Sequence, residues 1–204
     1  MASSPLSARN RPALRLLAIG LLTALAALLF AGCGSDDSEI DPGNAADAPS
    51  YTKMVDSAPP KLAALYDEGG TLLPGGEDAY RAQISELAGY PLVINKWASW
   101  CGPCREEFPF FQQESADRGD QVAFLGINAN DSNDAAETFL RDHPIPYPSF
   151  SDPDEAIANE EGASPEFPST IFYNAAGEKT YVHRGLYTSQ EDLAADIDRY
   201  AVNG

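Results

Sequence analysis

The chain has few cysteines: its 204 residues include only Cys33, Cys101 and Cys104. Secreted proteins that depend on disulfides for their stability carry several spaced pairs. This scarcity excludes a disulfide-stapled scaffold, so the 44% of residues that are hydrophobic must supply an ordinary packed core.

Positive charge is also scarce, since 13 Lys and Arg stand against 31 Asp and Glu, for a net charge of −18. A surface of this sign repels phosphate backbones and anionic lipid headgroups. The composition therefore excludes a nucleic-acid partner and electrostatic attachment to a membrane. It is compatible with a basic protein partner, or simply with a solvated acidic surface that has no specific partner.

Histidine is almost absent, and His143 and His183 lie far apart in the sequence. A zinc site requires four ligands with paired spacings, which these two residues and two nearby cysteines do not provide. No sequence motif for an organic cofactor occurs either. We therefore expect neither a metal nor a cofactor.

Only the N-terminus contains a long apolar run. Three arginines come first, the apolar residues 16–29 follow, and small residues come after the apolar run. This order is typical of a secretory signal. An uncleaved membrane anchor is the alternative, because the run is near the length that spans a bilayer. Both interpretations place the rest of the chain outside the cytoplasm, and an uncleaved anchor, like a lipid on the mature chain, would tether it to a membrane.

The end of this run, Ala31-Gly32-Cys33, resembles a bacterial lipobox, although Phe30 stands where leucine is usual. The resemblance implies a signal peptide over residues 1–32 and lipidation of Cys33, which becomes the first residue of the mature chain. After it, residues 33–50 are rich in Gly, Ser, Asp, Pro and Ala, which is typical of a flexible acidic linker. The folded domain is expected over residues 51–204.

Within this domain strands alternate with helices. We expect strands over residues 91–97, 121–128, 147–151, 169–173 and 179–183, and helices over residues 60–67, 77–88, 103–118 (interrupted by Pro109), 134–142, 154–160 and 190–200. A hairpin turn at residues 174–177 joins the last two strands. This order predicts an α/β fold in which helices flank a mixed β-sheet.

The motif Trp100-Cys101-Gly102-Pro103-Cys104 lies between an apolar strand and a helix. Cys101 is expected where the helix begins, so free N–H groups and the helix dipole favour its thiolate and make it the nucleophile. Cys104, one turn later, is placed to attack the mixed disulfide that forms on Cys101. The motif therefore predicts a thiol–disulfide redox site.

Residues 95–109, which contain this motif and Pro109 five residues after its second cysteine, resemble the active-site segment of the thioredoxin superfamily. The similarity is greatest to the extracytoplasmic TlpA/ResA-like branch and extends over residues 55–202. It implies a thioredoxin-like fold with a short N-terminal extension. It also implies the activity of a protein-disulfide oxidoreductase.

The resemblance further implies a cis-proline loop at Phe167-Pro168, opposite the dithiol, where an extended client segment pairs with the exposed backbone. A plain turn proline is the alternative at Pro168. Trp100 is expected to shield the dithiol and contact partners, whereas Trp97 is expected in the core.

Glu107 lies three residues after Cys104, on the same face of the predicted helix. In the TlpA/ResA-like branch an acid at this place is implicated in moving the proton of the second cysteine. Asn95 occupies the position of a buried aspartate in cytoplasmic thioredoxins and cannot take a proton, which strengthens this role for Glu107. The alternative is an exposed glutamate that only favours the helix dipole.

Together these features predict a membrane-anchored lipoprotein outside the cytoplasm that reduces disulfides in secreted clients, such as apocytochrome c, and receives electrons from a membrane redox partner. Gly102-Pro103 resembles reducing thioredoxins. A thiol peroxidase is a rival, but Ile94 and Ala98 stand where its motif requires proline and Ser or Thr. The other rival is a non-enzymatic lipoprotein that binds a partner and uses the cysteine pair as a structural clip.

Overall fold

The computed structural model describes residues 48–204. The predicted signal peptide, Cys33 and most of the predicted linker lie outside the described residues. Between residues 48 and 204, every helix is too short or too polar to span a bilayer.

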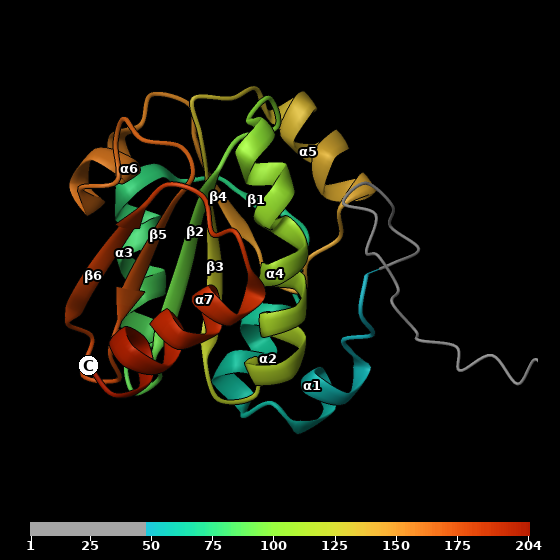
Figure 1. Cartoon of the computed structure of the whole chain (residues 1–204), viewed down its shortest axis with the longest axis vertical. Helices are drawn as coiled ribbons and strands as arrows, with labels where there is room; N and C mark the ends of the chain where they lie inside the picture. Colours follow the sequence, from blue (N-terminus) through green and yellow to red (C-terminus); the bar gives the residue numbers. More distant parts are fainter. Residues whose placement is uncertain (1–47) are drawn as a thin grey trace, which may run out of the picture. The chain divides into compact units, whose positions relative to one another are not determined.

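The described residues form a six-stranded sheet in the order β1-β4-β3-β2-β5-β6 (Figure 1). Its strands are β1 (Leu72–Leu73), β2 (Leu92–Trp97), β3 (Ala123–Ala129), β4 (Ser149–Asp152), β5 (Ser169–Tyr173) and β6 (Lys179–Arg184). The first four in this order run parallel, whereas β5 and β6 are antiparallel to their neighbours. The predicted mixed sheet is thus confirmed.

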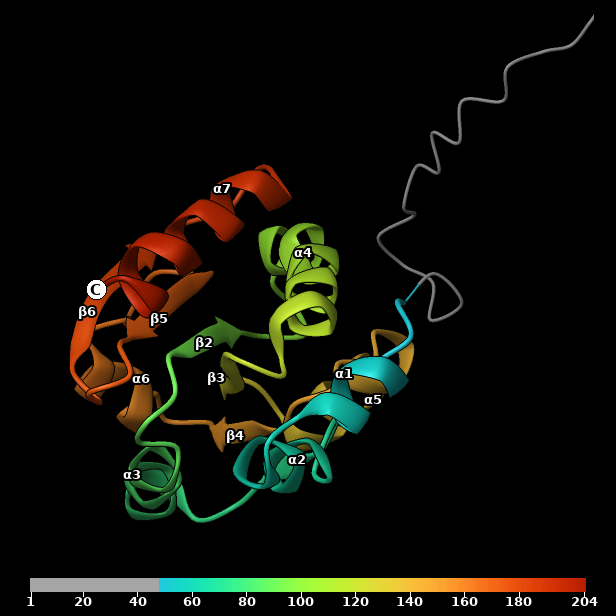
Figure 2. The same ribbon diagram turned by 90° about the horizontal axis from the view of Figure 1, so that it is seen from below.

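Helices cover both faces of the sheet. They are α1 (Thr52–Ser57), α2 (Pro60–Tyr66), α3 (Gly76–Glu86), α4 (Gly102–Arg118), α5 (Asn133–Asp142), α6 (Ala156–Glu161) and α7 (Gln190–Asp196), which continues as a π-helical segment (Ile197–Val202). Figure 2 shows α4 and α7 on one face of the sheet and α3 and α6 on the other. Because both faces are covered, the central strands β2 and β3 are buried along their whole length.

Trp97, at the end of β2, joins the sheet to two helices. Its ring lies 5.4 Å from that of Phe108 on α4 and 5.0 Å from that of Phe139 on α5. The indole N–H, which needs a partner when buried, donates to Ser149 Oγ at 3.1 Å. Trp97 is completely buried, so its predicted place in the core is confirmed.

One prediction about the helices is wrong, and the predicted last helix changes its geometry along its length. Pro109 does not interrupt α4, which runs unbroken from Gly102 to Arg118. A proline removes one backbone hydrogen bond, but Phe108 and Phe111 are buried on either side of it and hold the helix against the sheet. The last helix is α-helical only to Asp196, after which the backbone changes to π-helical geometry.

The topology gathers four loops at one edge of the sheet. Strands β2, β3 and β4 run parallel, so the segments that follow them leave from the same edge. Strand β5 runs the opposite way and therefore begins there. The turn to α4, the loops at residues 130–132 and 153–155, and the segment before β5 thus lie near one another, at the top of Figure 1.

Gly126 on β3 has no room for a side chain. An added Cβ would lie 2.0 Å from Ser149 Oγ and 3.1 Å from Trp97 Nε1. We expect Gly126→Ala to lower the free energy of unfolding by about 1–3 kcal/mol, because overpacking forces neighbours apart. Urea denaturation of the oxidised protein measures this change.

Gly102→Ala is the matched control, because a Cβ there meets no atom within 4 Å. Its free energy of unfolding should change by less than about 0.5 kcal/mol. Equal losses in the two variants would contradict the packing assigned to Gly126.

Candidate active site

The two cysteines of the motif form a disulfide at the start of α4. Their Cα atoms are 5.3 Å apart. Cys101 is the N-cap residue, and its sulfur accepts a hydrogen bond from the backbone N–H of Cys104 at 3.1 Å. When the disulfide opens, this N–H and the helix dipole favour a thiolate on Cys101. Cys104 is completely buried, whereas Cys101 retains a small exposed area.

The turn before Cys101 is held by hydrogen bonds to the loop after β3. Asp131 accepts the backbone N–H and the hydroxyl of Ser99, at 2.6 and 2.9 Å. The Ser99 carbonyl accepts two N–H groups of Arg105, and the indole of Trp100 donates to the carbonyl of Asn130. The loop after β3 thereby fixes where the disulfide lies.

Trp100 and Phe167 form an aromatic contact beside the disulfide, with ring centroids 5.0 Å apart. Trp100 is 56% exposed, more than any other large hydrophobic side chain between residues 48 and 204. The Phe167–Pro168 peptide bond is cis, and so is Ser164–Pro165, which the sequence did not indicate. The aromatic contact brings the Phe167–Pro168 peptide next to the turn that carries Cys101.

Gly102 and Pro103, between the cysteines, are the first two residues of α4. Proline suits the first turn of a helix, because its fixed φ is helical and its missing N–H would have no partner there. Both residues are exposed, so this part of the turn is open to an approaching molecule.

Glu107 is completely buried, so the alternative of an exposed glutamate is wrong. Its Oε2 accepts the backbone N–H of Tyr187 at 3.0 Å, and its Oε1 has no partner among the described residues. Burial raises the pKa of this carboxyl to about 8, although the Tyr187 hydrogen bond opposes part of the rise. This value is close to the pKa of a free thiol, so Glu107 is suited to exchange a proton with one.

Other buried polar groups face the same side of the sheet. Asn95 and Thr170 lie directly opposite each other on β2 and β5. Side chains alternate along a strand, so Asn95 shares the face of Trp97, which is the face covered by α4. Both amide atoms of Asn95, the Thr170 hydroxyl and the Tyr147 hydroxyl are buried without a partner among the described residues. A buried polar group without a partner costs about 1–3 kcal/mol.

Sequence reasoning missed two residues near the site. Tyr187 gives no signal in the sequence, because its contact with Glu107 spans 80 residues and uses only its backbone. Lys96 did give a signal, since a lysine in the middle of an apolar strand needs a buried partner. It is completely buried in β2 and forms an ion pair with Glu155.

The two histidines lie apart. His143 packs against Phe139, and the imidazole of His183 lies 3.7 Å from the carboxylate of Asp196. The part of the chain that the structure describes contains no group of three or more His, Cys, Asp and Glu side chains placed to hold a metal ion.

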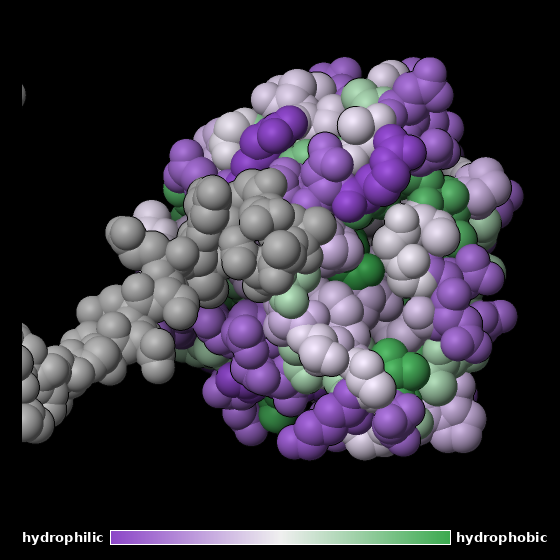
Figure 3. All heavy atoms as spheres, turned by 90° about the vertical axis from the view of Figure 1, so that its right-hand side faces the viewer, coloured by the Kyte–Doolittle hydropathy of each residue, from purple (hydrophilic) through white to green (hydrophobic). Residues whose placement is uncertain are grey.

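Figure 3 shows the side of the molecule on which α1 and α5 lie. Hydrophilic residues cover much of this side, and the apolar patches among them are small and scattered. Apolar residues scattered in this way are common on protein surfaces.

The comparisons with known proteins agree with this geometry. Residues 71–182 match the model of the AhpC/TSA family. The chain is 32% identical over 191 residues to the thiol:disulfide interchange protein DsbE of Allochromatium vinosum, which covers 91% of this chain and 93% of the relative. It is 28% identical over 109 residues to the thiol-disulfide oxidoreductase ResA of Bacillus subtilis, covering 53% of this chain and 60% of the relative.

A solved structure also matches: that of a secreted Mycobacterium tuberculosis disulfide oxidoreductase homologous to DsbE of E. coli. It is 28% identical, with a TM-score of 0.51, and the match covers 56% of this chain and 85% of that one. The thioredoxin-like fold and the resemblance to ResA-like proteins are therefore confirmed. The homologues of the chain are thiol–disulfide oxidoreductases of the ResA and DsbE type.

The raised pKa of Glu107 predicts how stability depends on pH. Between pH 4.5 and about 8 the folded protein retains a proton that the unfolded chain has released, so stability falls as the pH rises through this range. The amide that replaces the carboxyl in Glu107→Gln does not titrate. This variant should therefore gain a few kcal/mol relative to the wild type as the pH rises from 4.5 to about 8.

Urea denaturation of the oxidised proteins at about pH 5, 7 and 9 measures this difference. Glu106→Gln, at the exposed neighbouring position, is the control and should follow the wild type. A constant difference between Glu107→Gln and wild type at all of these pH values would rule out a protonated, buried Glu107.

Proposed function

Because the chain belongs to the AhpC/TSA family, we propose that it is a protein thiol–disulfide oxidoreductase that reduces disulfides in client proteins. The observation that carries this proposal is the Cys101–Cys104 disulfide at the start of α4, where Cys101 is the N-cap residue. The match to ResA spans only 60% of that relative's length, so the relative's activity cannot simply be transferred. We therefore infer the activity of this chain from the geometry of its site.

The reaction begins with the reduced pair. The Cys101 thiolate attacks one sulfur of a client disulfide, which forms a mixed disulfide and releases the first client thiolate. The Cys104 thiolate then attacks the sulfur of Cys101, which releases the second client thiolate and forms the Cys101–Cys104 disulfide. Two electrons pass from the dithiol to the client.

Cys104 must lose a proton before it attacks, and Glu107 is the proposed acceptor. The carboxyl lies one turn further along α4 and has a pKa near that of a thiol. Its ionised form, whose population grows as the pH approaches 8, therefore takes the proton at little cost in free energy. Asn95 cannot accept the proton. The Tyr187 N–H stabilises the carboxylate form of Glu107, which accepts the proton from Cys104 and is restored when the proton leaves.

The loop at Phe167-Pro168 is the proposed binding surface for the client. Proline has no N–H, and the segment before it lies at the start of β5, beside the exposed Trp100. An extended client segment that paired with this backbone would present its disulfide to Cys101.

The oxidised pair must be reduced again by a donor with its own dithiol, and we propose a membrane redox partner for this step. A location outside the cytoplasm, with Cys33 lipidated and residues 1–32 removed, agrees with the N-terminal sequence and with the secreted relative. Apocytochrome c, which must present two reduced cysteines before haem attachment, is the proposed client.

The peroxidase alternative is not favoured. A peroxidatic cysteine at position 101 would need a proline seven residues earlier and Ser or Thr three residues earlier, where Ile94 and Ala98 stand. Ile94 is buried within β2, and Ala98 is buried directly after it.

Cysteine substitutions test the assigned roles. Cys104→Ser should accumulate a mixed disulfide with a client through Cys101, because the residue that resolves it is gone. Cys101→Ser should accumulate none, since the remaining Cys104 is completely buried. Non-reducing electrophoresis followed by mass spectrometry identifies the adducts. Equal trapping by both variants would contradict the roles given to the two cysteines.

The reduction potential of the pair tests the direction. We expect the full-length protein, equilibrated in glutathione and dithiothreitol buffers, to give a value near or below about −250 mV, as suits a reductase. A value near about −120 mV would mean that the protein inserts disulfides, and the direction proposed here would be wrong.

A further inference from the structure

Lys96 is a buried charge that the proposed reaction does not use. It belongs to the central strand β2 and has no exposed surface. A buried ammonium group is costly unless it is paired and hydrogen-bonded, so its contacts identify what it holds.

The ammonium group of Lys96 makes four contacts. Nζ donates to Glu155 Oε2 at 2.9 Å and to the carbonyls of Ala163 and Glu166, each at 3.2 Å. It also lies 3.7 Å from the centroid of the Phe167 ring, as a cation–π contact. All four partners belong to residues 155–167, the segment that leads to Pro168.

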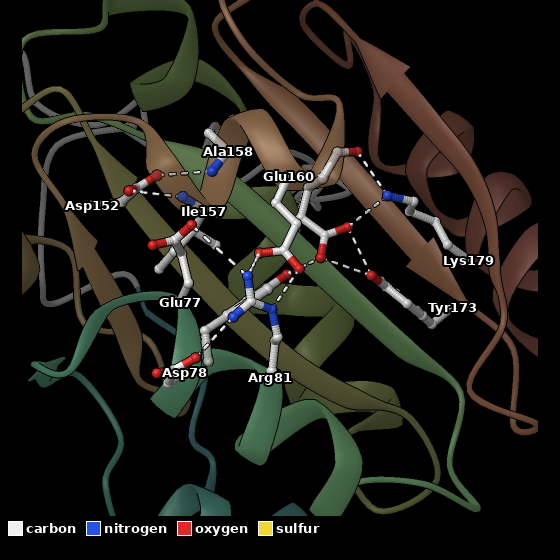
Figure 4. Close-up of polar contacts among 11 residues, drawn as sticks. Glu77, Asp78, Arg81, Asp152, Ile157, Ala158, Glu160, Tyr173 and Lys179 are labelled. Atoms are coloured by element: carbon white, nitrogen blue, oxygen red, sulfur yellow. Dashed lines mark hydrogen bonds and ion pairs between the residues drawn. The ribbon is translucent and has the colours of Figure 1, made fainter.

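The helix within this segment is held elsewhere by other groups. At its beginning, Asp152 accepts the backbone N–H groups of Ile157 and Ala158, and at its end Lys179 binds the carboxylate of Glu161 (Figure 4). Arg81 of α3 forms an ion pair with Glu160. Helix α6 thus has anchors other than Lys96 at both of its ends. In the loop that follows it, Lys96 contacts the carbonyls of Ala163 and Glu166 and the ring of Phe167.

Phe167 connects the buried lysine to the surface. The ammonium of Lys96 contacts its ring, and the exposed ring of Trp100 contacts it as well. Lys96 also precedes Trp97 on the strand that leads to Cys101, and it lies opposite Ser169 of β5. One side chain therefore ties the strand that carries the dithiol to the loop that contains the cis-proline.

We propose that Lys96 is a positioning residue for client recognition, whose ammonium holds Phe167 and the loop before Pro168 in the conformation that binds an extended client segment. This inference rests on the proposed function. A loop fixed in advance binds more tightly, because the client does not have to order it. The lysine acts on binding and takes no part in the exchange of sulfur bonds.

Lys96→Met tests the proposal, because methionine fills a similar volume and lacks the ammonium group. The assay is the reduction of insulin disulfides by the full-length protein, with dithiothreitol as the electron source. We expect the KM for insulin to rise about tenfold, with kcat changed less than about twofold. The rate at which dithiothreitol alone reduces the protein does not depend on the client loop. This rate should therefore change far less than the KM does.

Lys179→Met is the matched control. It also removes an ammonium group that binds a carboxylate of α6, but that carboxylate belongs to Glu161, which is not a partner of Lys96. Its KM for insulin should stay within about twofold of the wild type. A general loosening of the fold would raise the KM in both lysine variants and would overturn the proposal.

A double-mutant cycle shows whether Lys96 acts through Phe167. In a Phe167→Leu background, Lys96→Met should raise the KM much less than it does in the wild type. Additive effects would overturn the proposal. Glu155→Gln keeps the lysine but removes its ion pair, so it gives the same test if Lys96→Met does not fold, with an expected rise in KM of about threefold.

The two proposals fail in different ways. If the wild-type protein exchanges with dithiothreitol and reduces insulin while both Lys96→Met and Glu155→Gln retain its KM, the role of Lys96 is overturned alone. If the wild-type protein does not exchange with dithiothreitol, the proposed function is overturned and the role of Lys96 with it.

Discussion

The packing of α4 against the sheet is the contact on which the site depends. Trp97 at the end of β2 packs against Phe108 on α4 and Phe139 on α5. This aromatic cluster fixes the position and orientation of α4 relative to the sheet. The start of α4 then carries the cysteines at the edge of the sheet, while its second turn carries Glu107 into the interior. One packed helix therefore sets both the accessibility of the sulfur atoms and the pKa of the acid beside them.

Strand β2 has costly polar side chains on both of its faces. On the side of α4 it presents Asn95, whose amide atoms have no partner among the described residues. On the other side it presents Lys96, which is fully paired. Burying such polar groups costs free energy that packing must offset.

The sequence predicts the fold and the dithiol well because their signals are local. Apolar strands and the CxxC spacing depend on residues near one another in the chain. Pro109 was misjudged because tertiary packing outweighs the one hydrogen bond that proline removes. The partners of Glu107 and Lys96 were not predictable, because Tyr187 and residues 155–167 reach them only through the topology of the sheet.

The different exposure of the two tryptophans has an optical consequence. Trp97 is sealed in the core and reports on the integrity of the fold, whereas Trp100 is exposed and adjoins the Cys101–Cys104 disulfide in the chain. A disulfide can quench the fluorescence of an indole close to it, so we expect the intrinsic emission of the protein to change when the Cys101–Cys104 bond opens. That emission would then report the oxidation state of the protein without an added dye.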